Sequence, residues 1–367
     1  MKKMRVIALV LSLVFTLVAF SSCMKVEVAM EYKGETVSAN IYSYWLSYYK
    51  TSFVTPANDT ESYWSTKNEE GKTNEDVLKE LVMLDVKYSL VCQKLFKDMN
   101  LSLSEKNVKE IDTSINDLIK AYGSKRELNG FLKNYNLNVN MLKEIYENKK
   151  KTSLVYESLY AKNGDRVIDE KELDDYFKNN YSRLDMIMIY DTYVYELDDK
   201  GNPVFDDKTQ SYKKKTLTLE ESKVKNDLAN DIVKKLNNGE SFDSLKEQYN
   251  ENLKKDVYKD GYYISSNDVS VYGKEITAAS KELNIGEYKL IDDGEVICIV
   301  MRKDLVDKAY NSSDYQEQFE NILEYCKMAD FEVFIKDLIV DVKVFDDVVS
   351  KYSLNDINFI TDYSLIV

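Results

Sequence analysis

The chain offers few candidate catalytic or metal-binding residues. None of its 367 residues is histidine. Histidine has an ordinary pKa close to neutrality, and its imidazole is a common metal ligand. Its absence excludes Ser/His/Asp and Cys/His triads, and also the zinc sites that contain histidine. The cysteines are scattered without a C-x-x-C motif, so we predict neither a disulfide framework nor a metal cluster. We expect Cys92, Cys298 and Cys326 to be small buried apolar residues.

Acidic residues offer the other candidate ligands. Three pairs of adjacent aspartates could hold calcium: Asp198 with Asp199, Asp206 with Asp207, and Asp292 with Asp293. None has the ligand spacing of an EF-hand, so turns or solvated faces are the favoured interpretation. We therefore expect no metal site and no cofactor.

The N-terminus has the pattern of a secretion signal. Lys2, Lys3 and Arg5 precede an apolar run over residues 6–20, which is short for a membrane-spanning helix. Cys23 follows two serines, a pattern similar to the lipobox of bacterial lipoproteins. We predict a signal peptide over residues 1–22 and a lipid on Cys23. The alternative is an ordinary cleaved signal with an incidental cysteine.

Charge and composition limit the partners. The formal net charge of -14 argues against nucleic acid and against a basic patch that binds anionic lipids. With only 2 prolines and 11 glycines, the chain is expected to be folded and rich in helix. Its length predicts more than one domain.

The first half of the chain has helical periodicity. After a strand expected at residues 26–31 and a helix at residues 39–53, a long amphipathic helix is expected from Asn74, which would be its N-cap. Its predicted apolar stripe consists of Val77, Leu81, Leu84, Tyr88, Val91 and Leu95. Another helix begins near Ser104, where Asn107 takes the place of the Glu or Gln that completes a capping box.

The periodicity changes at Leu184. Residues 184–190 form an apolar, β-compatible run, and an exposed hairpin or loop is expected near residues 193–218. Helical segments and two further strands, at residues 262–264 and 295–302, follow, and the chain ends in helical segments. A β-containing module between helical segments is the simplest arrangement, in which the last helix packs back against the first ones.

The order of these elements resembles two known families. Residues 76–82, 99–104 and 168–177 resemble the N-terminal chaperone region of the PrsA/SurA group of extracytoplasmic foldases. Residues 184–302 resemble a parvulin-type (PpiC-type) peptidyl-prolyl isomerase domain, with the spaced pattern Ala229, Ile232, Leu236, Gly239 and Phe242, and then Gly261.

The resemblance implies an α+β fold. It consists of a helical chaperone domain at residues 23–182, an inserted parvulin-like domain at residues 183–304 and a C-terminal helical segment at residues 305–367 that completes the first domain. The inserted α/β domain would be a small, mostly antiparallel sheet flanked by helices. The resemblance also implies a peptide-binding cradle formed by Met186, Met188, Tyr262, Tyr263, Ile276, Val296 and Cys298.

The chain departs from the parvulin pattern in its polar residues. Met186 and Val296 stand where the family has its two histidines, and Glu251 or Asn252 stands near its usual Asp or Cys. Prolyl isomerisation breaks no covalent bond, so loss of the histidines weakens the case for an enzyme and leaves it open. No catalytic residue is assigned.

The prediction for function is a lipid-anchored extracytoplasmic chaperone that binds unfolded, newly secreted polypeptides. Two alternatives stay open: an active peptidyl-prolyl isomerase with a rebuilt site, and a surface lipoprotein that acts as an assembly or adhesion module. The expected partners are unfolded polypeptides and, through the lipid on Cys23, a bacterial membrane. A homodimer is among the candidate assemblies.

Overall fold

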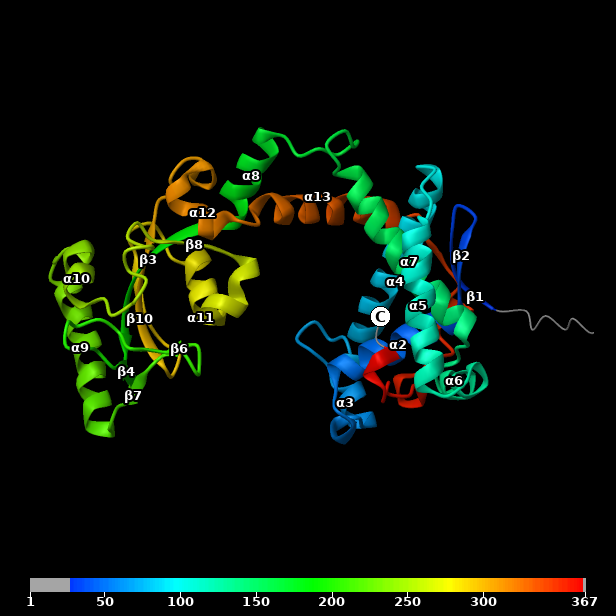
Figure 1. The fold of residues 1–367 in the computed structure, drawn as a ribbon, viewed down its shortest axis with the longest axis horizontal. Coiled ribbons are helices and arrows are strands. Elements are labelled where there is room, and N and C mark those ends of the chain that lie inside the picture. The colour runs from blue at the N-terminus through cyan, green and yellow to red at the C-terminus, as the bar shows by residue number, and fades with distance from the viewer. Residues whose placement is uncertain (1–26, 366–367) are drawn as a thin grey trace, which may run out of the picture. The chain divides into compact units, whose positions relative to one another are not determined.

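The structure is a computed structural model that describes residues 27–365. The expected signal peptide and Cys23 lie outside these residues. The chain divides into two compact units (Figure 1). We call Met1–Val167 with Met328–Val367 the helical unit, and Ile168–Lys327 the sheet unit.

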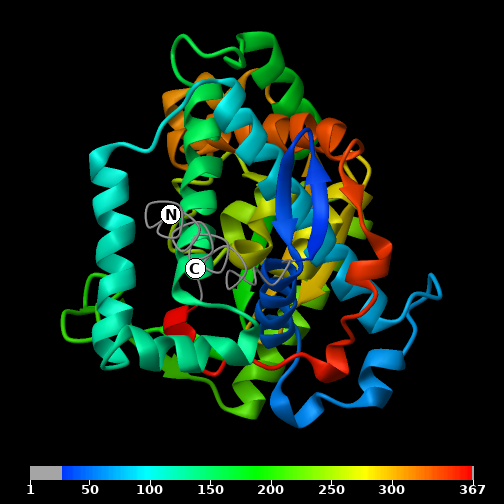
Figure 2. The same ribbon diagram turned by 90° about the vertical axis from the view of Figure 1, so that its right-hand side faces the viewer.

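The helical unit joins both ends of the described chain. Its helices are α2 (Ala39–Phe53), α3 (Glu61–Ser65), α4 (Asn74–Asp98), α5 (Glu105–Ala121), α6 (Lys125–Leu132), α7 (Val139–Leu159), most of α13 (Ile322–Ile339) and α14 (Asp346–Val349). A small antiparallel sheet places β1 (Val28–Tyr32) between β11 (Lys343–Val344) and β2 (Glu35–Ser38). Figure 2 shows the β1–β2 hairpin beside the start of α2.

The buried stripe of the central helix α4 agrees with the expected one only in part: Val91 is buried as expected. Its buried residues include Leu78, Val82, Val86 and Leu90. Leu81 and Leu84, which we expected in the stripe, are exposed. Both stripes satisfy the helical spacing, and packing against α2 and α7 selects between them.

The start of α4 differs from the expectation, whereas α5 has the expected N-cap, Ser104. Thr73, not Asn74, is the N-cap of α4, and it forms a capping box with Asp76. Asn107 completes the capping box of α5, because its side-chain oxygen accepts the Ser104 N–H at 3.1 Å. An asparagine can thus replace the usual Glu or Gln here.

The sheet unit is built on an antiparallel four-stranded sheet with the order β8-β3-β10-β9. Its elements are α8 (Glu170–Asn180), β3 (Tyr181–Tyr190), α9 (Leu219–Asn237), α10 (Phe242–Tyr249), β8 (Tyr262–Ser265), α11 (Val269–Glu282), β9 (Tyr288–Asp292), β10 (Val296–Lys303) and α12 (Gln316–Phe319). Helices α9 and α10 pack on one face of the sheet, and α11 packs on the other. Helices with small antiparallel sheets confirm the α+β class.

Residues 193–218 form two short antiparallel ribbons. β4 (Tyr193–Tyr195) pairs with β7 (Lys214–Thr216), and β5 (Phe205–Asp206) pairs with β6 (Ser211–Tyr212). The ribbons carry exposed aromatic side chains, including Phe205, at their surface.

The predictions for cysteines and acidic pairs fit this fold. Cys92, Cys298 and Cys326 are buried, as expected, and form no disulfide among residues 27–365. Asp198 accepts backbone N–H groups of Lys200 and Asn202 at 2.9 and 2.8 Å, so it stabilises a turn. The Asp292–Asp293 pair caps the turn before β10 in the same way.

No helix among residues 27–365 combines the length and the hydropathy that a membrane crossing needs.

Candidate functional site

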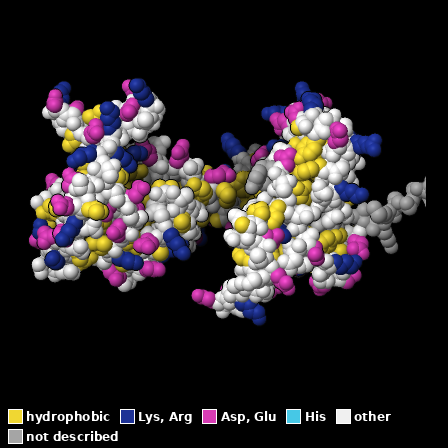
Figure 3. Space-filling view, turned by 90° about the horizontal axis from the view of Figure 1, so that it is seen from below, with side chains coloured by type: hydrophobic (Ala, Val, Ile, Leu, Met, Phe, Trp, Pro, Cys, Tyr) yellow, Lys and Arg dark blue, Asp and Glu magenta, His cyan; other side chains and the backbone are white. Residues whose placement is uncertain are grey.

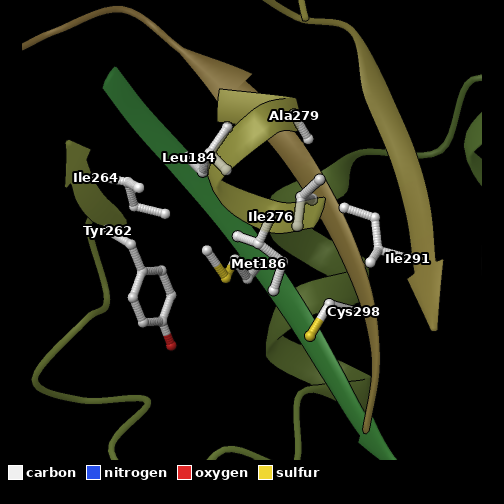
Figure 4. Close-up of a cluster of buried hydrophobic side chains, with 9 residues drawn as sticks. Leu184, Met186, Tyr262, Ile264, Ile276, Ala279, Ile291 and Cys298 are labelled. Atoms are coloured by element: carbon white, nitrogen blue, oxygen red, sulfur yellow. The ribbon is translucent and has the colours of Figure 1, made fainter. Parts of the chain in front are cut away.

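One face of the sheet in the sheet unit collects most of the predicted cradle residues. Side chains alternate along a strand, so Met186 and Met188 of β3 lie on the same face. The register places Cys298 opposite Met188 and Val300 opposite Met186 on β10. Figure 4 shows Met186 and Cys298 on neighbouring strands, with Ile276 of α11 close to both.

Most of this predicted cradle is a packed core. Met186, Tyr262 and Cys298 are each at most 4% exposed, because α11 covers this part of the face, and Ile276 of α11 is itself 5% exposed where it packs on them. Such side chains leave no surface for a peptide in this structure. The sequence pattern could not reveal this, because an apolar strand face looks the same whether a helix or a ligand covers it.

Tyr263 lies on the opposite side of β8 from Tyr262. Its ring packs 4.9 Å from Phe319 and 6.1 Å from Phe177, measured between ring centroids. These residues belong to a separate aromatic cluster that includes Tyr181. The alternation of β8 therefore removes Tyr263 from the cradle.

The accessible part of the face is its half-buried edge, which we define as Met188, Val296, Tyr258 and Tyr272. All four pack against the buried cluster and keep part of their surface exposed. The Tyr258 ring stacks on Tyr262 with centroids 4.5 Å apart and planes 18° apart. This edge is aromatic and apolar, and Tyr258 and Tyr272 were not among the predicted residues.

A second tyrosine stack borders the same end of β3. Tyr190 lies opposite Val296 in the register. Its ring stacks on Tyr193 with centroids 5.0 Å apart, and burial raises the pKa of Tyr190 above its ordinary value. Tyr193 opens the ribbon of β4 and β7, so the insertion begins next to the half-buried edge.

The two positions inferred for the family histidines are not neighbours. Met186 lies opposite Val300, whereas Val296 lies opposite Tyr190. Four residues along β10 correspond to about 13 Å. The Met188–Cys298 pair lies between them, so side chains at the two inferred positions could not share one hydrogen bond.

The polar groups near this face support the backbone. The Asn250 side-chain oxygen accepts the Met188 N–H at 3.0 Å, and the Glu251 carboxylate accepts the Tyr190 N–H at 2.9 Å. Lys225 pairs with the same carboxylate. Asn252 donates its amide to the Tyr262 hydroxyl. Glu251 and Asn252, the candidates for the family's Asp or Cys, thus have structural partners.

The Cys298 thiol does not supply a nucleophile. Burial, with Asp292 and Asp293 adding to its effect, raises the pKa of Cys298 to about 12. The reactive form of cysteine is the thiolate, so this thiol is inert near neutral pH.

Sequence reasoning missed a buried charge on β3. Asp185 is 1% exposed, and its carboxylate pairs with Lys246 at 2.6 Å and Lys303 at 3.1 Å. The sequence did contain a signal for it, an aspartate inside an apolar strand. A buried charge needs partners, so such an aspartate indicates an ion cluster. The pair of lysines joins β3, α10 and β10, and it holds the sheet under the candidate face.

Comparison with known proteins finds no matching family profile and no matching curated protein. Solved structures of PrsA foldases are similar to the chain. PrsA from Bacillus subtilis is 18% identical, with 78% of this chain and 92% of that chain covered and a TM-score of 0.23.

Two further solved structures give similar values. Foldase protein PrsA from Streptococcus pneumoniae is 17% identical over 78% of this chain and 97% of that chain, with a TM-score of 0.24. Foldase protein PrsA from Lactococcus lactis is 12% identical, with 89% of this chain and 98% of that chain covered and a TM-score of 0.22. TM-scores of this size establish no common arrangement of the whole chain.

Proposed function

We propose that the protein is an extracytoplasmic chaperone that binds unfolded exported polypeptides through the half-buried edge of a parvulin-like sheet unit. The observation that carries the proposal is the chemistry of this edge. It presents two tyrosines, a methionine and a valine, and its nearest polar side chains already have structural partners. Such a surface suits holding an apolar segment better than acid–base catalysis.

The half-buried edge suits weak binding of polypeptide segments that differ in sequence. Methionine adapts to different partners, and tyrosine offers a large contact area with little loss of side-chain entropy. The backbone beneath it is fixed by the Asp185 ion cluster and by Asn250, so the contact residues stand on a rigid support.

Membrane attachment belongs to the same proposal. The lipobox-like sequence at Cys23 would tether the chaperone outside the cytoplasm, where newly exported chains emerge. A lipid is needed for this because the net charge of -14 disfavours adsorption to anionic membranes.

The test is suppression of aggregation of an unfolded secreted client by the purified protein at an equimolar ratio. We expect Met188→Lys to require about fivefold more chaperone for the same suppression, since one contact residue typically contributes about 1 kcal/mol. Tyr258→Ala, which adds no charge beside the core, should act in the same direction.

The matched control is Val224→Lys. Val224 is 67% exposed on α9, which packs on the other face of the sheet. Suppression should be unchanged in this variant. Failure of the unaltered protein to suppress aggregation would remove the proposal, and equal loss in Val224→Lys would remove the half-buried edge as its site.

A further inference from the structure

A cavity of about 260 Å³ lies within the helical unit, between α2, α4 and α7. Helix α4 packs against both of the others, and Figure 1 labels all three in the helical unit. Ligand pockets for drug-sized molecules start at about 300 Å³, so this cavity suits a group the size of one amino-acid side chain.

Aromatic rings form much of the cavity wall. Trp45, Tyr48 and Tyr49 of α2 and Tyr88 of α4 line it. The Trp45 and Tyr48 rings meet edge to face with centroids 5.2 Å apart, and Tyr48 meets Tyr49 at 5.5 Å. Faces of such rings attract cations, with Trp the strongest.

Two carboxylates line the same cavity. Asp85 of α4 is half-buried among the rings, and Glu144 of α7 lies at the exposed rim. Among residues 27–365, neither forms an ion pair with a lysine or arginine. Lys149, also exposed, is the cationic side chain that lines the cavity, so the lining carries an excess of negative charge.

The surroundings of Asp85 leave its charge poorly compensated. Burial raises the pKa of Asp85, and a hydrogen bond from the Tyr49 hydroxyl lowers it in part. A carboxylate removed from water is stabilised by a cation that brings its own charge to the same place. An aromatic cavity beside such a carboxylate is complementary to an organic cation with an apolar stem.

We infer that this cavity binds the side chain of a lysine or arginine in a bound polypeptide, with the stem against the aromatic rings and the cationic head at Asp85 and Glu144. The inference rests on the proposed chaperone function, because it names the residue class that an unfolded client inserts. The net charge of -14 favours the approach of basic segments.

The experiment measures binding of short capped peptides to the full-length protein by calorimetry. One peptide contains a single lysine between leucines, and its partner has norleucine, which keeps the apolar stem, in place of lysine. We expect the lysine peptide to bind about tenfold more tightly, by the combined cation–π and carboxylate contacts. The ratio of the two affinities, lysine peptide over norleucine peptide, should fall as salt is added.

Two variants locate the effect. Asp85→Asn keeps the shape of the cavity wall and should reduce the ratio to near one, while binding of the norleucine peptide stays unchanged. Glu144→Gln, at the exposed rim, should reduce the ratio in part without affecting folding. The matched control is Asp117→Asn, which removes the same charge from a 62% exposed position on α5.

The outcomes separate this inference from the proposed function. Equal binding of both peptides, or a tenfold ratio that survives Asp85→Asn, overturns the cavity site even if aggregation of the client is still suppressed. If N-acetyl-lysine methylamide alone binds as tightly as the lysine peptide, the cavity serves free organic cations, and the assignment to polypeptides is overturned. Loss of aggregation suppression alone would instead count against the chaperone.

Discussion

At the scale of residues, a bidentate ion pair joins two distant parts of the helical unit. Arg166 donates from Nε and Nη2 to the Asp330 carboxylate at 2.7 and 2.8 Å, and the Tyr160 hydroxyl donates to the same carboxylate. The hydrogen bonds from Arg166 hold the pKa of Asp330 below its ordinary value of 3.8, and Tyr160 acts in the same direction. Charge-assisted pairs with this geometry are both strong and specific.

Replacement of Asp330 by asparagine should therefore reduce stability in a pH-dependent way. A carboxylate whose pKa is lowered by folding stabilises the native state above its unfolded pKa, and this contribution is lost as the pH falls through the folded pKa. We expect Asp330→Asn to lower the free energy of unfolding by about 1–3 kcal/mol at pH 7. Urea titrations at pH 7 and at pH 3 should show the difference shrinking in acid.

The comparison for this prediction is Asp117→Asn, since Asp117 pairs with Lys120 on the exposed surface. Such pairs contribute about 0–1 kcal/mol, so this variant should stay close to the unaltered protein at both pH values. In the view of Figure 3, Lys and Arg side chains lie interspersed with Asp and Glu side chains on the surface. A pH-independent loss in Asp330→Asn would show that packing, not the ion pair, is responsible.

At the scale of elements, local patterns predicted which segments become helices and strands, and packing decided which way they face. The apolar run over residues 184–190 indicated a strand, and β3 extends over Tyr181–Tyr190. The phase of α4 was wrong at Leu81 and Leu84 because two apolar stripes compete on it, and contacts with α2 and α7 bury the one through Leu78 and Leu90. Periodicity contains no information about where the partner helices lie.

One element-scale contact that no local pattern predicts holds the C-terminal segment against α2. The Lys50 ammonium is 1% exposed and donates to the carbonyls of Leu354 and Ile357 at 2.6 and 2.8 Å. It also pairs with Asp59 at 2.8 Å. A lysine in an aromatic-rich helix would ordinarily be expected at its surface.

Replacing Lys50 by methionine should loosen this segment before the rest of the helical unit. Two carbonyls and the Asp59 carboxylate would lose the Lys50 ammonium, and removing one member of a buried pair costs about 3–5 kcal/mol. Hydrogen exchange should accelerate first in residues 353–361. Lys97→Met, which removes a 63% exposed lysine paired with Glu35, should leave exchange there unchanged. Uniform acceleration over all helices would contradict a local role for Lys50.

At the scale of the whole molecule, the helical unit is completed by the end of the chain. The Tyr44 hydroxyl donates to the Leu365 carbonyl at 2.7 Å across 321 residues of sequence. The sequence could indicate the order of helical, sheet and helical segments, because that order depends on local periodicity. It could not indicate that α11 buries Met186 and Cys298, because burial depends on how the chain returns over the sheet.

The same burial decides how the isomerase alternative must be tested. Met186→Arg would place a charge in a fully buried site and unfold the sheet unit, so a variant at the half-buried edge is the informative one. In a refolding assay limited by prolyl isomerisation, we expect no acceleration by micromolar protein. Burial raises the pKa of Tyr272 and of Cys298, so both stay protonated near neutral pH, and the Glu251 carboxylate is already held by Tyr190 and Lys225. Acceleration that Met188→Arg abolishes and Val224→Arg preserves would instead establish an isomerase that twists the amide by apolar contacts alone.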